Sequence, residues 1–244
     1  MLHQSTAPCQ RRDAGSTALS IVMPVLNEAE TLPATLAELQ PMRRRGAELI
    51  LVDGGSGDDS LLLAAPLVDL ILTAPKGRAR QMRAGAARAS GRVLWFLHAD
   101  IRVPGQADRA ILAAVAGGAE WGWFDLSLSG NRPTLRMVAW LMNRRARLSR
   151  IATGDQGLFV TRAAYRAVGG FPELPLMEDL GMSQRLKRRA GAPTVLAGPL
   201  LASSRRWEAH GVWRTITLMW WLRLCFWLGA DPAWLERVYY GRGK

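Results

Sequence analysis

Two polar side chains, His98 and Asp100, come directly after an apolar run at residues 93–97, and their position suits the binding of a charged ligand. A short apolar run of this kind is typical of a strand buried on both faces of a parallel sheet. Ligands of open α/β sheets bind beyond the carboxyl ends of the strands, where a carboxylate can hold a hard cation against a diphosphate. The alternative is structural: Asp100 would cap a helix that starts near Gln106.

Three further apolar runs, at residues 19–25, 48–53 and 68–73, predict other strands of the same sheet. The second run ends in Asp53, and the glycine-rich residues 54–57 that follow can pass close to a ligand. Helical segments separate the runs. This alternation predicts an α/β fold with a parallel sheet and right-handed crossovers.

The segment after the first strand also carries polar residues. Pro24 is expected to end the ladder of that strand, because proline has no amide proton to donate. Asn27 is expected to cap a helix that runs to about Leu39. Glu28 and Glu30 would then lie in its first turn, where the helix dipole favours acids.

Basic residues cluster at two places in the first half of the chain. Residues 76–80 open an alanine-rich helix, whereas residues 43–46, three arginines and a glycine, are interpreted as a solvated turn. In a parallel sheet, Asp53, Asp100 and residues 76–80 fall at one edge. Two acids, a glycine loop and several cations there favour a metal-bound nucleoside diphosphate over helix capping alone.

The second half is rich in tryptophan and arginine. A strand is predicted at 121–128, and residues 132–150 form a basic amphipathic helix with six arginines and no acid. Residues 212–228 are apolar but are interrupted by Arg214 and Arg223. Both helical segments can lie in a membrane interface or pack on the sheet, and the sequence leaves the two possibilities open.

A helix is predicted from Glu178 to about Arg189, and it begins with two neighbouring acids, Glu178 and Asp179. They lie at the positive end of a helix in a basic region. Capping explains many such pairs, so a capping role stays open beside a catalytic one.

The 244 residues carry a formal net charge of +12, which favours anionic partners such as phosphates, nucleotides or an acidic membrane surface. The two cysteines, Cys9 and Cys225, support neither a disulfide framework nor a zinc site. Residues 1–18 show no secretory signal, and no run is long enough to span a membrane. We therefore expect a cytoplasmic protein, with peripheral attachment to the cytoplasmic membrane face as an open alternative.

Taken together and in their order along the chain, the strands, helices and polar residues described above resemble those of the family 2 glycosyltransferases. The resemblance extends over about residues 19–207. That family has the GT-A fold, an α/β fold with a doubly wound, mostly parallel sheet and helices on both faces. The resemblance rests on an ordered set of motifs at residues 23–28, 52–56, 77–85, 98–100, 169–171, 178–179 with 185–186, and 206–207. Residues 76–82 and 205–208 and the tryptophan-rich C-terminal helix resemble one branch, the radical-SAM/selenodomain-associated transferases of arsenosugar type.

Residues 1–17 are polar and without pattern and are expected to form a disordered tail. Residues 18–244 show no internal repeat or linker and are expected to form a single glycosyltransferase domain. Within it, residues 18–100 would bind the nucleotide and residues 101–208 the acceptor. Residues 209–244 would form C-terminal helices.

The resemblance also implies metal-dependent transfer of a sugar, with inversion, from a UDP- or GDP-linked donor to an acceptor hydroxyl. Asp100 and His98 would hold Mn²⁺ or Mg²⁺ against the diphosphate and so stabilise the leaving group. Asp179 would be the general base. The nucleotide sugar would be bound by Pro24, Asn27, Glu28, Asp53, Lys76, Arg80, Arg206 and Trp207.

The chain departs from the family pattern at four places. Asp53 is followed by glycine where the family often has a second acid. His98 replaces the first acid of the usual Asp-x-Asp, and an imidazole suits Mn²⁺ better than Mg²⁺. Arg83 stands where the family usually has asparagine. The Gln of the processive pattern is missing at residues 206–207, which argues against a polymerising synthase.

Two other classes of protein remain as alternatives. A nucleotidyltransferase uses an acid-bound metal on a similar sheet, but it should carry a glycine-rich basic loop after the first strand, where this chain has residues 24–28. A catalytically weak membrane-surface binding protein would explain the net charge and the Arg/Trp helices, but not the acids Asp53, Asp100 and Asp179. No nucleic-acid partner is expected, because the basic residues are not joined to a recognition motif.

Overall fold

The computed structural model describes residues 17–205 and 211–241 of the chain. Within these residues, eight strands form one sheet in the order β3-β2-β1-β4-β7-β6-β8-β5. The strands are β1 (Leu19–Val25), β2 (Glu48–Asp53), β3 (Leu70–Thr73), β4 (Val93–Phe96), β5 (Ile101–Arg102), β6 (Trp121–Leu128), β7 (Phe159–Thr161) and β8 (Thr194–Ala202).

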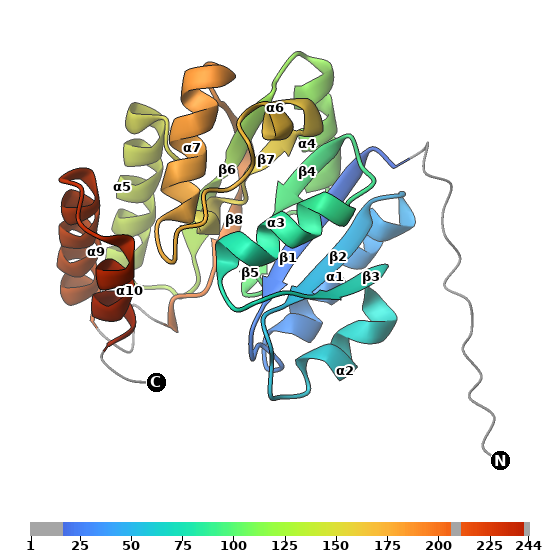
Figure 1. Ribbon diagram of the computed structural model, residues 1–244, viewed down its shortest axis with the longest axis horizontal. Helices are drawn as coiled ribbons and strands as arrows, with labels where there is room; N and C mark the ends of the chain where they lie inside the picture. Colours follow the sequence, from blue (N-terminus) through green and yellow to red (C-terminus); the bar gives the residue numbers. More distant parts are fainter. Residues whose placement is uncertain (1–16, 206–210, 242–244) are drawn as a thin grey trace.

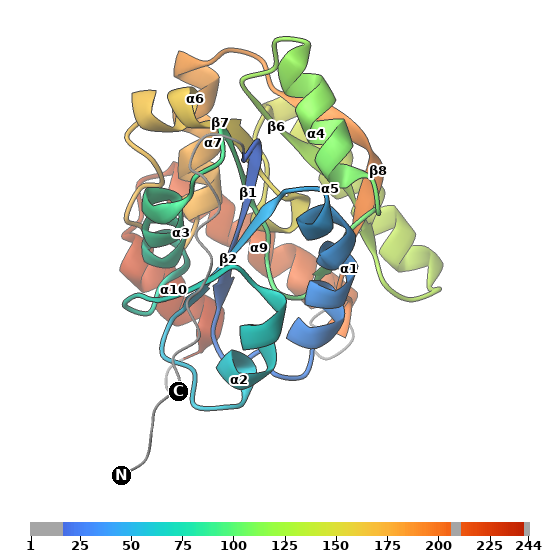
Figure 2. The same cartoon turned by 90° about the vertical axis from the view of Figure 1, so that its right-hand side faces the viewer.

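Helices cover both faces of this sheet. Figure 2 shows α3, α6 and α7 on one side of it and α1, α4 and α5 on the other. The helices are α1 (Leu32–Arg44), α2 (Ser60–Ala64), α3 (Arg78–Arg88), α4 (Ala107–Ala116), α5 (Pro133–Ser149), α6 (Arg162–Ala167), α7 (Glu178–Arg189), α9 (Val212–Trp227) and α10 (Pro232–Tyr240), with short 3₁₀ helices η1 (Ala65–Leu67) and η2 (Gly154–Gln156). Each face packs its own hydrophobic cluster, as expected for an α/β fold.

The sheet is parallel in its first half and mixed in its second. Strands β3, β2, β1 and β4 run parallel, whereas β7 is antiparallel to both β4 and β6, and β5 is antiparallel to β8. Strand β8 returns parallel to β6. The predicted α/β class is confirmed, and the short buried strand before His98 is confirmed as β4. A parallel arrangement brings the carboxyl ends of β1, β2 and β4 to one edge.

Two details of the first crossover differ from the prediction. Strand β1 does not end at Pro24, because Pro24 lies opposite Val52 and the ladder continues to Val25, opposite Asp53. Helix α1 begins at Leu32 instead of after Asn27, with Thr31 as its N-cap and no acid in its first turn.

Tertiary hydrogen bonds explain the later start of the helix. The amide of Asn27 donates to the Ser56 hydroxyl at 2.9 Å, and its side-chain oxygen accepts from the Gly57 amide at 2.8 Å. Asn27 adopts a left-handed φ of 54°, so it cannot stand at the start of a right-handed helix. The loops after β1 and β2 are therefore bound to each other.

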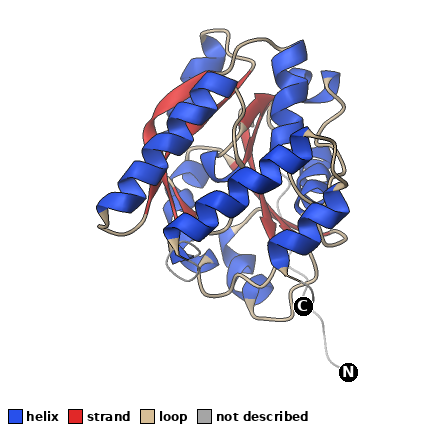
Figure 3. Ribbon diagram, turned by 90° about the vertical axis from the view of Figure 1, so that its left-hand side faces the viewer, coloured by secondary structure: helices blue, strands red, loops and turns tan. Residues whose placement is uncertain are grey.

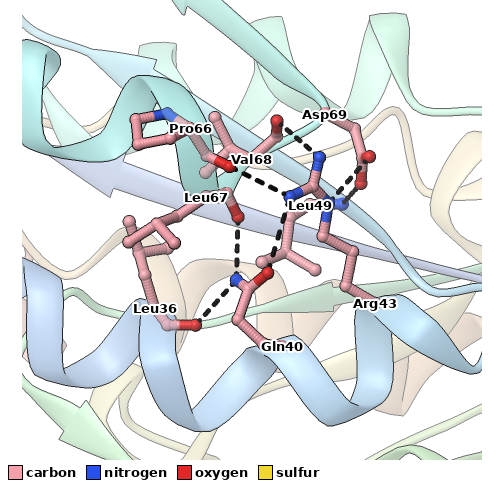
Figure 4. Close-up of polar contacts among 8 residues, drawn as sticks. All are labelled: Leu36, Gln40, Arg43, Leu49, Pro66, Leu67, Val68 and Asp69. Carbon is pink, nitrogen blue, oxygen red and sulfur yellow. Dashed lines mark hydrogen bonds and ion pairs between the residues drawn. The ribbon is translucent and has the colours of Figure 1, made fainter. Parts of the chain in front are cut away.

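The arginines at 43–46 are only in part the solvated turn that the sequence suggested: Arg44 and Arg45 are exposed and residues 45–46 form a turn, but Arg43 and Arg45 have specific partners. Arg43 is in the last turn of α1, and its guanidinium binds Asp69 at 2.9 Å and the carbonyl oxygen of Val68 at 3.0 Å (Figure 4). Arg45 forms a forked ion pair with the buried Asp108, with its shorter N–O distance at 2.7 Å. These partners are far away in the sequence, so a local pattern could not reveal them.

The C-terminal helices α9 and α10 pack at the end of the molecule that carries α5 and α7 (Figure 1). Leu222 of α9 and Leu235 of α10 are fully buried in a small cluster with residues of the α7 region. Viewed from that end, helices lie in front of the sheet (Figure 3). Packing on the domain is thus confirmed for one face of α9. No helix within residues 17–205 or 211–241 has the length and apolar character needed to cross a membrane.

Candidate active site

A cavity of about 350 Å³ lies beyond the carboxyl end of β4. Its walls come from segments that are far apart in the sequence: the turn after β4, the start of α3, α5, the η2 loop, the start of α7, and α9. The polar side chains that line it are Arg78, His98, Asp100, Arg145, Thr153, Asp155, Glu178, Asp179, Ser203, Thr215, Arg223 and Tyr239. Of the predicted site residues, His98, Asp100 and Asp179 are therefore brought together.

His98 is held against the η2 loop. Its Nδ1 atom lies 3.5 Å from a carboxylate oxygen of Asp155, and the ring is 10% exposed. A side chain at position 154 would not fit, because a Cβ there would lie 2.3 Å from Cε1 of His98. Glycine at 154 therefore allows the imidazole to contact the loop backbone.

Asp179 is fixed by two backbone amides. Its Oδ2 atom accepts a hydrogen bond from the Gly154 amide at 2.7 Å, and its Oδ1 atom accepts one from the Leu180 amide at 2.7 Å. The sequence left a capping role open for this pair of acids, and the structure gives both of these amide contacts to Asp179. Met177, just before the helix, has a left-handed φ of 67°, a conformation that is strained for a residue with a side chain and often occurs at functional sites.

Glu178 is buried beside Asp179, with 4% of its surface exposed. The pKa of Glu178 is raised from its ordinary 4.5 to about 7, chiefly by burial and then by the neighbouring Asp179 carboxylate, while Arg78 and His98 act in the opposite direction. A carboxyl group in this state takes up or releases a proton near neutral pH, which marks it as a candidate functional group.

The residues on the nucleoside side mainly shape the loops. Asp53 is 3% exposed, and its carboxylate accepts hydrogen bonds from the Gly55 and Ser56 amides and from the Ser56 hydroxyl, the last at 2.6 Å. Pro24 is buried within β1. The Glu28 carboxylate accepts a hydrogen bond from the Thr31 hydroxyl at 2.9 Å. The Asp53 carboxylate thus fixes the loop after β2, and its predicted binding of the nucleotide sugar stays a prediction.

The predicted phosphate-binding cations are only partly placed at the cavity. Lys76 and Arg80 are exposed and do not line it, whereas Arg78, between them, does. Arg206 and Trp207 lie outside the described residues. Sequence reasoning found the basic segment but not the residue within it that faces the site, because that depends on the rotation of α3.

Several residues at the site were not assigned a role from the sequence. The Gln81 amide nitrogen donates to the carbonyl oxygens of Val25 and Val52, both at 2.8 Å, and so joins α3 to the ends of β1 and β2. Arg145 of α5 and Arg223 of α9 line the cavity. One indication of this position was present in the sequence: Arg223, like Arg214, interrupts a helical segment that is otherwise mainly apolar.

The donor set around the cavity fits a divalent cation that is shared with a ligand. Within the described residues, no three His, Cys, Asp or Glu side chains cluster closely enough to hold a metal ion by themselves. Mg²⁺ and similar ions are commonly held by one or two carboxylates together with substrate phosphates, and the Asp100 carboxylate beside His98 matches that smaller set.

The arrangement of strands and helices is that of the GT-A glycosyltransferases. TarS of S. aureus aligns with a TM-score of 0.63 over 91% of this chain and 69% of that chain, at 15% identity. Glucosyl-3-phosphoglycerate synthase from Mycobacterium tuberculosis, in complex with Mn²⁺, UDP and glucosyl-3-phosphoglycerate, aligns with a TM-score of 0.58 over 83% and 77% of the two chains, at 18% identity. At such identities the likeness shows the fold alone.

The sequence profile described as "Glycosyl transferase family 2" matches residues 20–167, more than half of the chain, so the protein belongs to that family. An uncharacterised glycosyltransferase of Mycobacterium tuberculosis is 32% identical over 138 residues, which are 54% of this chain and 48% of the relative. The undecaprenyl-phosphate 4-deoxy-4-formamido-L-arabinose transferase of Pseudomonas savastanoi pv. phaseolicola is 36% identical over 98 residues, 35% of this chain and 29% of the relative. The chain thus spans about half or less of the length of these curated relatives.

The buried carboxyl of Glu178 leads to a prediction for the metal-free protein. Because its pKa in the folded state is raised from 4.5 to about 7, the folded state holds this proton more tightly than the unfolded state, so stability falls as pH rises across that window. The loss is at most roughly 3 kcal/mol. The glutamine of Glu178→Gln cannot ionise. The melting temperature of the variant minus that of the native protein should therefore increase from pH 5 to pH 8, when both are measured in EDTA.

The exposed Glu173→Gln serves as the matched control and should show no such trend, because its side chain is 63% exposed. A difference between Glu178→Gln and the native protein that is flat from pH 5 to pH 8 would contradict the assignment.

Proposed function

We propose that the protein transfers a sugar, with inversion, from a nucleoside diphosphate sugar to an acceptor hydroxyl, in a reaction that depends on Mn²⁺ or Mg²⁺. The observation that carries the proposal is the single cavity that contains His98, Asp100 and an amide-oriented Asp179 in a chain of glycosyl transferase family 2. The nucleotidyltransferase alternative is not favoured by this family membership.

Asp179 is the general base of the proposed reaction. It accepts the proton of the acceptor hydroxyl while the hydroxyl oxygen forms a bond to the anomeric carbon of the sugar. The bond from that carbon to the diphosphate breaks, and its electron pair leaves with the diphosphate, so the configuration is inverted. The Gly154 amide holds the carboxylate in one orientation through the 2.7 Å hydrogen bond.

Asp100 and His98 would hold the divalent ion at the diphosphate of the donor. When bound, such an ion neutralises the charge that develops on the leaving group. Arg78 adds a positive charge at the same cavity wall, and Lys76 and Arg80 extend the positive surface beside it.

The nucleoside is bound by the joined loops after β1 and β2. Asn27, Glu28 and Asp53 give these loops their shape through the hydrogen bonds described above, and the buried Pro24 leads into them. Binding of the nucleotide sugar by Arg206 and Trp207, which lie outside the described residues, stays a prediction from the resemblance.

UDP is the nucleotide to test first, because TarS and glucosyl-3-phosphoglycerate synthase have been crystallised with UDP compounds, and GDP is the comparison. Membership of the radical-SAM/selenodomain-associated branch stays a prediction from residues 76–82, 205–208 and the C-terminal helix. Membership of that branch would not identify the acceptor compound.

Attachment to an anionic membrane surface is a second proposal, and the exposed side chains of α9 and α5 support it. Trp213, Trp220, Trp227 and Leu228 are between 63% and 79% exposed, and Trp140 of α5 is 58% exposed, with Arg144 stacked 5.6 Å from its ring centroid. Exposed aromatic residues with arginines nearby are typical of helices that lie at a lipid interface.

Asp100→Ala should lose the metal-dependent part of UDP binding. In the native protein, UDP at about 100 times its dissociation constant should stabilise the fold by about 2.7 kcal/mol, and the shift in melting temperature should grow when Mn²⁺ is added. The variant should show the same small shift with and without Mn²⁺. The exposed Glu173→Ala is the matched control and should behave as the native protein does. An unchanged response to Mn²⁺ in Asp100→Ala rules out this metal ligand.

Asp179→Asn should fold and bind UDP with metal, but its turnover should fall by about 10²–10⁴, because an amide can accept the Gly154 hydrogen bond but cannot take a proton. Glu178→Gln should lose less. Turnover is measured as UDP released from a UDP-sugar, and binding as the thermal shift with Mn²⁺ and UDP. Near-native turnover of Asp179→Asn would place the base elsewhere, with Asp155 or Glu178 as the candidate.

Vesicle sedimentation checks the membrane proposal. Binding should rise with the fraction of anionic lipid and fall with salt. The double variant Trp213→Ser/Trp227→Ser should bind less, whereas Leu62→Ser, at a leucine of α2 that is 74% exposed, should not change binding. If the native protein does not sediment with anionic vesicles at low salt, the exposed face has another role.

A further inference from the structure

Two arginines on the wall that α5 and α9 form around the cavity have no partner for their buried donors. Arg145 comes from α5 and Arg223 from α9, and both line the cavity. The Nε and Nη2 atoms of Arg145 and the Nε atom of Arg223 are buried and make no hydrogen bond among the described residues. Buried donors of this kind are rare in folded proteins, and each needs an explanation.

The pKa shifts of the two arginines also indicate that their charges are incompletely neutralised. The pKa of the Arg145 guanidinium is lowered to about 10, chiefly by burial and then by the positive charge of Arg223, while Asp179 acts in the opposite direction. Burial likewise lowers the pKa of Arg223, against the effect of Asp179 and Asp155. Within the described residues, neither arginine forms a salt bridge. The protein thus holds two like charges close together, with nearby acids that compensate them only in part.

Apart from Thr215, the rest of this wall is apolar. Val138, Leu141 and Met142 of α5 and Ile216, Met219 and Trp220 of α9 line the same cavity. The ligand that suits this wall has an oxyanion for the two guanidinium groups and an apolar or neutral body for the surrounding side chains. A guanidinium fork matches the oxygens of a phosphate group, to which it can donate two parallel hydrogen bonds.

We propose that Arg145 and Arg223 bind a phosphate group of the acceptor and so hold the reacting hydroxyl next to Asp179. This inference rests on the proposed function, because it assigns the anion to the acceptor. Asp179 is the acid that acts on both arginines, whereas the donor-side cation Arg78 acts on Glu178. The acceptor class is therefore a hydroxyl compound with a phosphate a few bonds away, either a small phosphate ester or the headgroup of a phospholipid.

The test measures binding without turnover. The protein is first saturated with Mn²⁺ and UDP. Calorimetry then measures the binding of three compounds, each titrated separately: glycerol 1-phosphate, dihexanoyl phosphatidylglycerol below its critical micelle concentration, and uncharged glycerol. The native protein should bind at least one of the two phosphate compounds and not glycerol. Binding of the ester alone identifies a small acceptor, and binding of the lipid alone identifies a headgroup.

Arg145→Gln and Arg223→Gln should each weaken binding of the phosphate compound by about tenfold or more, as expected for loss of a charge-assisted hydrogen bond to phosphate. Their affinity for Mn²⁺ and UDP should change by less than about threefold. Arg136→Gln on α5 and Arg214→Gln on α9 are the matched controls, because both side chains are exposed and neither lines the cavity. Both controls should bind as the native protein does.

The stability of the variants separates binding from a structural role. If the arginines are kept for a ligand, Arg145→Met and Arg223→Met should melt at the same or a higher temperature than the native protein, because a buried charge without a partner is removed. Lower melting temperatures together with unchanged phosphate binding would make the pair structural and overturn the proposal.

Two other outcomes would also overturn the proposal. Failure of both phosphate compounds to bind the native protein would exclude the assigned ligand. A tenfold loss of UDP affinity in the glutamine variants, with phosphate binding unchanged, would assign the arginines to the donor. Failure of the glycosyltransferase proposal gives a different result, namely no Asp100-dependent binding of UDP with Mn²⁺, and the phosphate titration can then be repeated without nucleotide.

Discussion

The site depends most on the close approach between the η2 loop and its two neighbours at Gly154. The amide of this residue orients the Asp179 carboxylate, and its α-carbon lies so near His98 that a methyl group would overlap the ring. One residue without a side chain therefore sets the spacing between β4 and α7. The loop that carries it is held by a capping box, in which the buried Gln156 side chain accepts from the Thr153 amide at 3.0 Å.

Local signals were enough to predict most of the elements. The strands at 19–25, 48–53 and 121–128 and the helix from Glu178 to Arg189 have the predicted bounds, because apolar runs and neighbouring turn residues are local in the sequence. The start of α1 and the role of Arg43 were missed. Both depend on partners about 25 to 30 residues away, such as Ser56 for Asn27 and Asp69 for Arg43.

The candidate site could be predicted only where local sequence signals position its residues. His98 and Asp100 follow a recognisable strand, and Asp179 begins a recognisable helix, so their gathering follows from the topology of the sheet. The burial of Glu178, and the selection of Arg78 in place of Lys76 or Arg80, depend on side-chain directions that no pattern fixes. Arg145 and Arg223 meet only because α9 packs beside α5, and that contact joins segments 78 residues apart.

The family profile ends at residue 167, whereas Asp179 and Arg223 follow later in the chain. The matched residues carry strands β1 to β7 and helices α1 to α6, so α5 on the far wall of the cavity belongs to them, whereas α7, α9 and α10, which also line the cavity, follow later. The cavity is therefore bounded partly by helices that come after the strand framework in the chain. Exchanging α9 would reshape one wall of the cavity without altering the register of β1, β2 and β4.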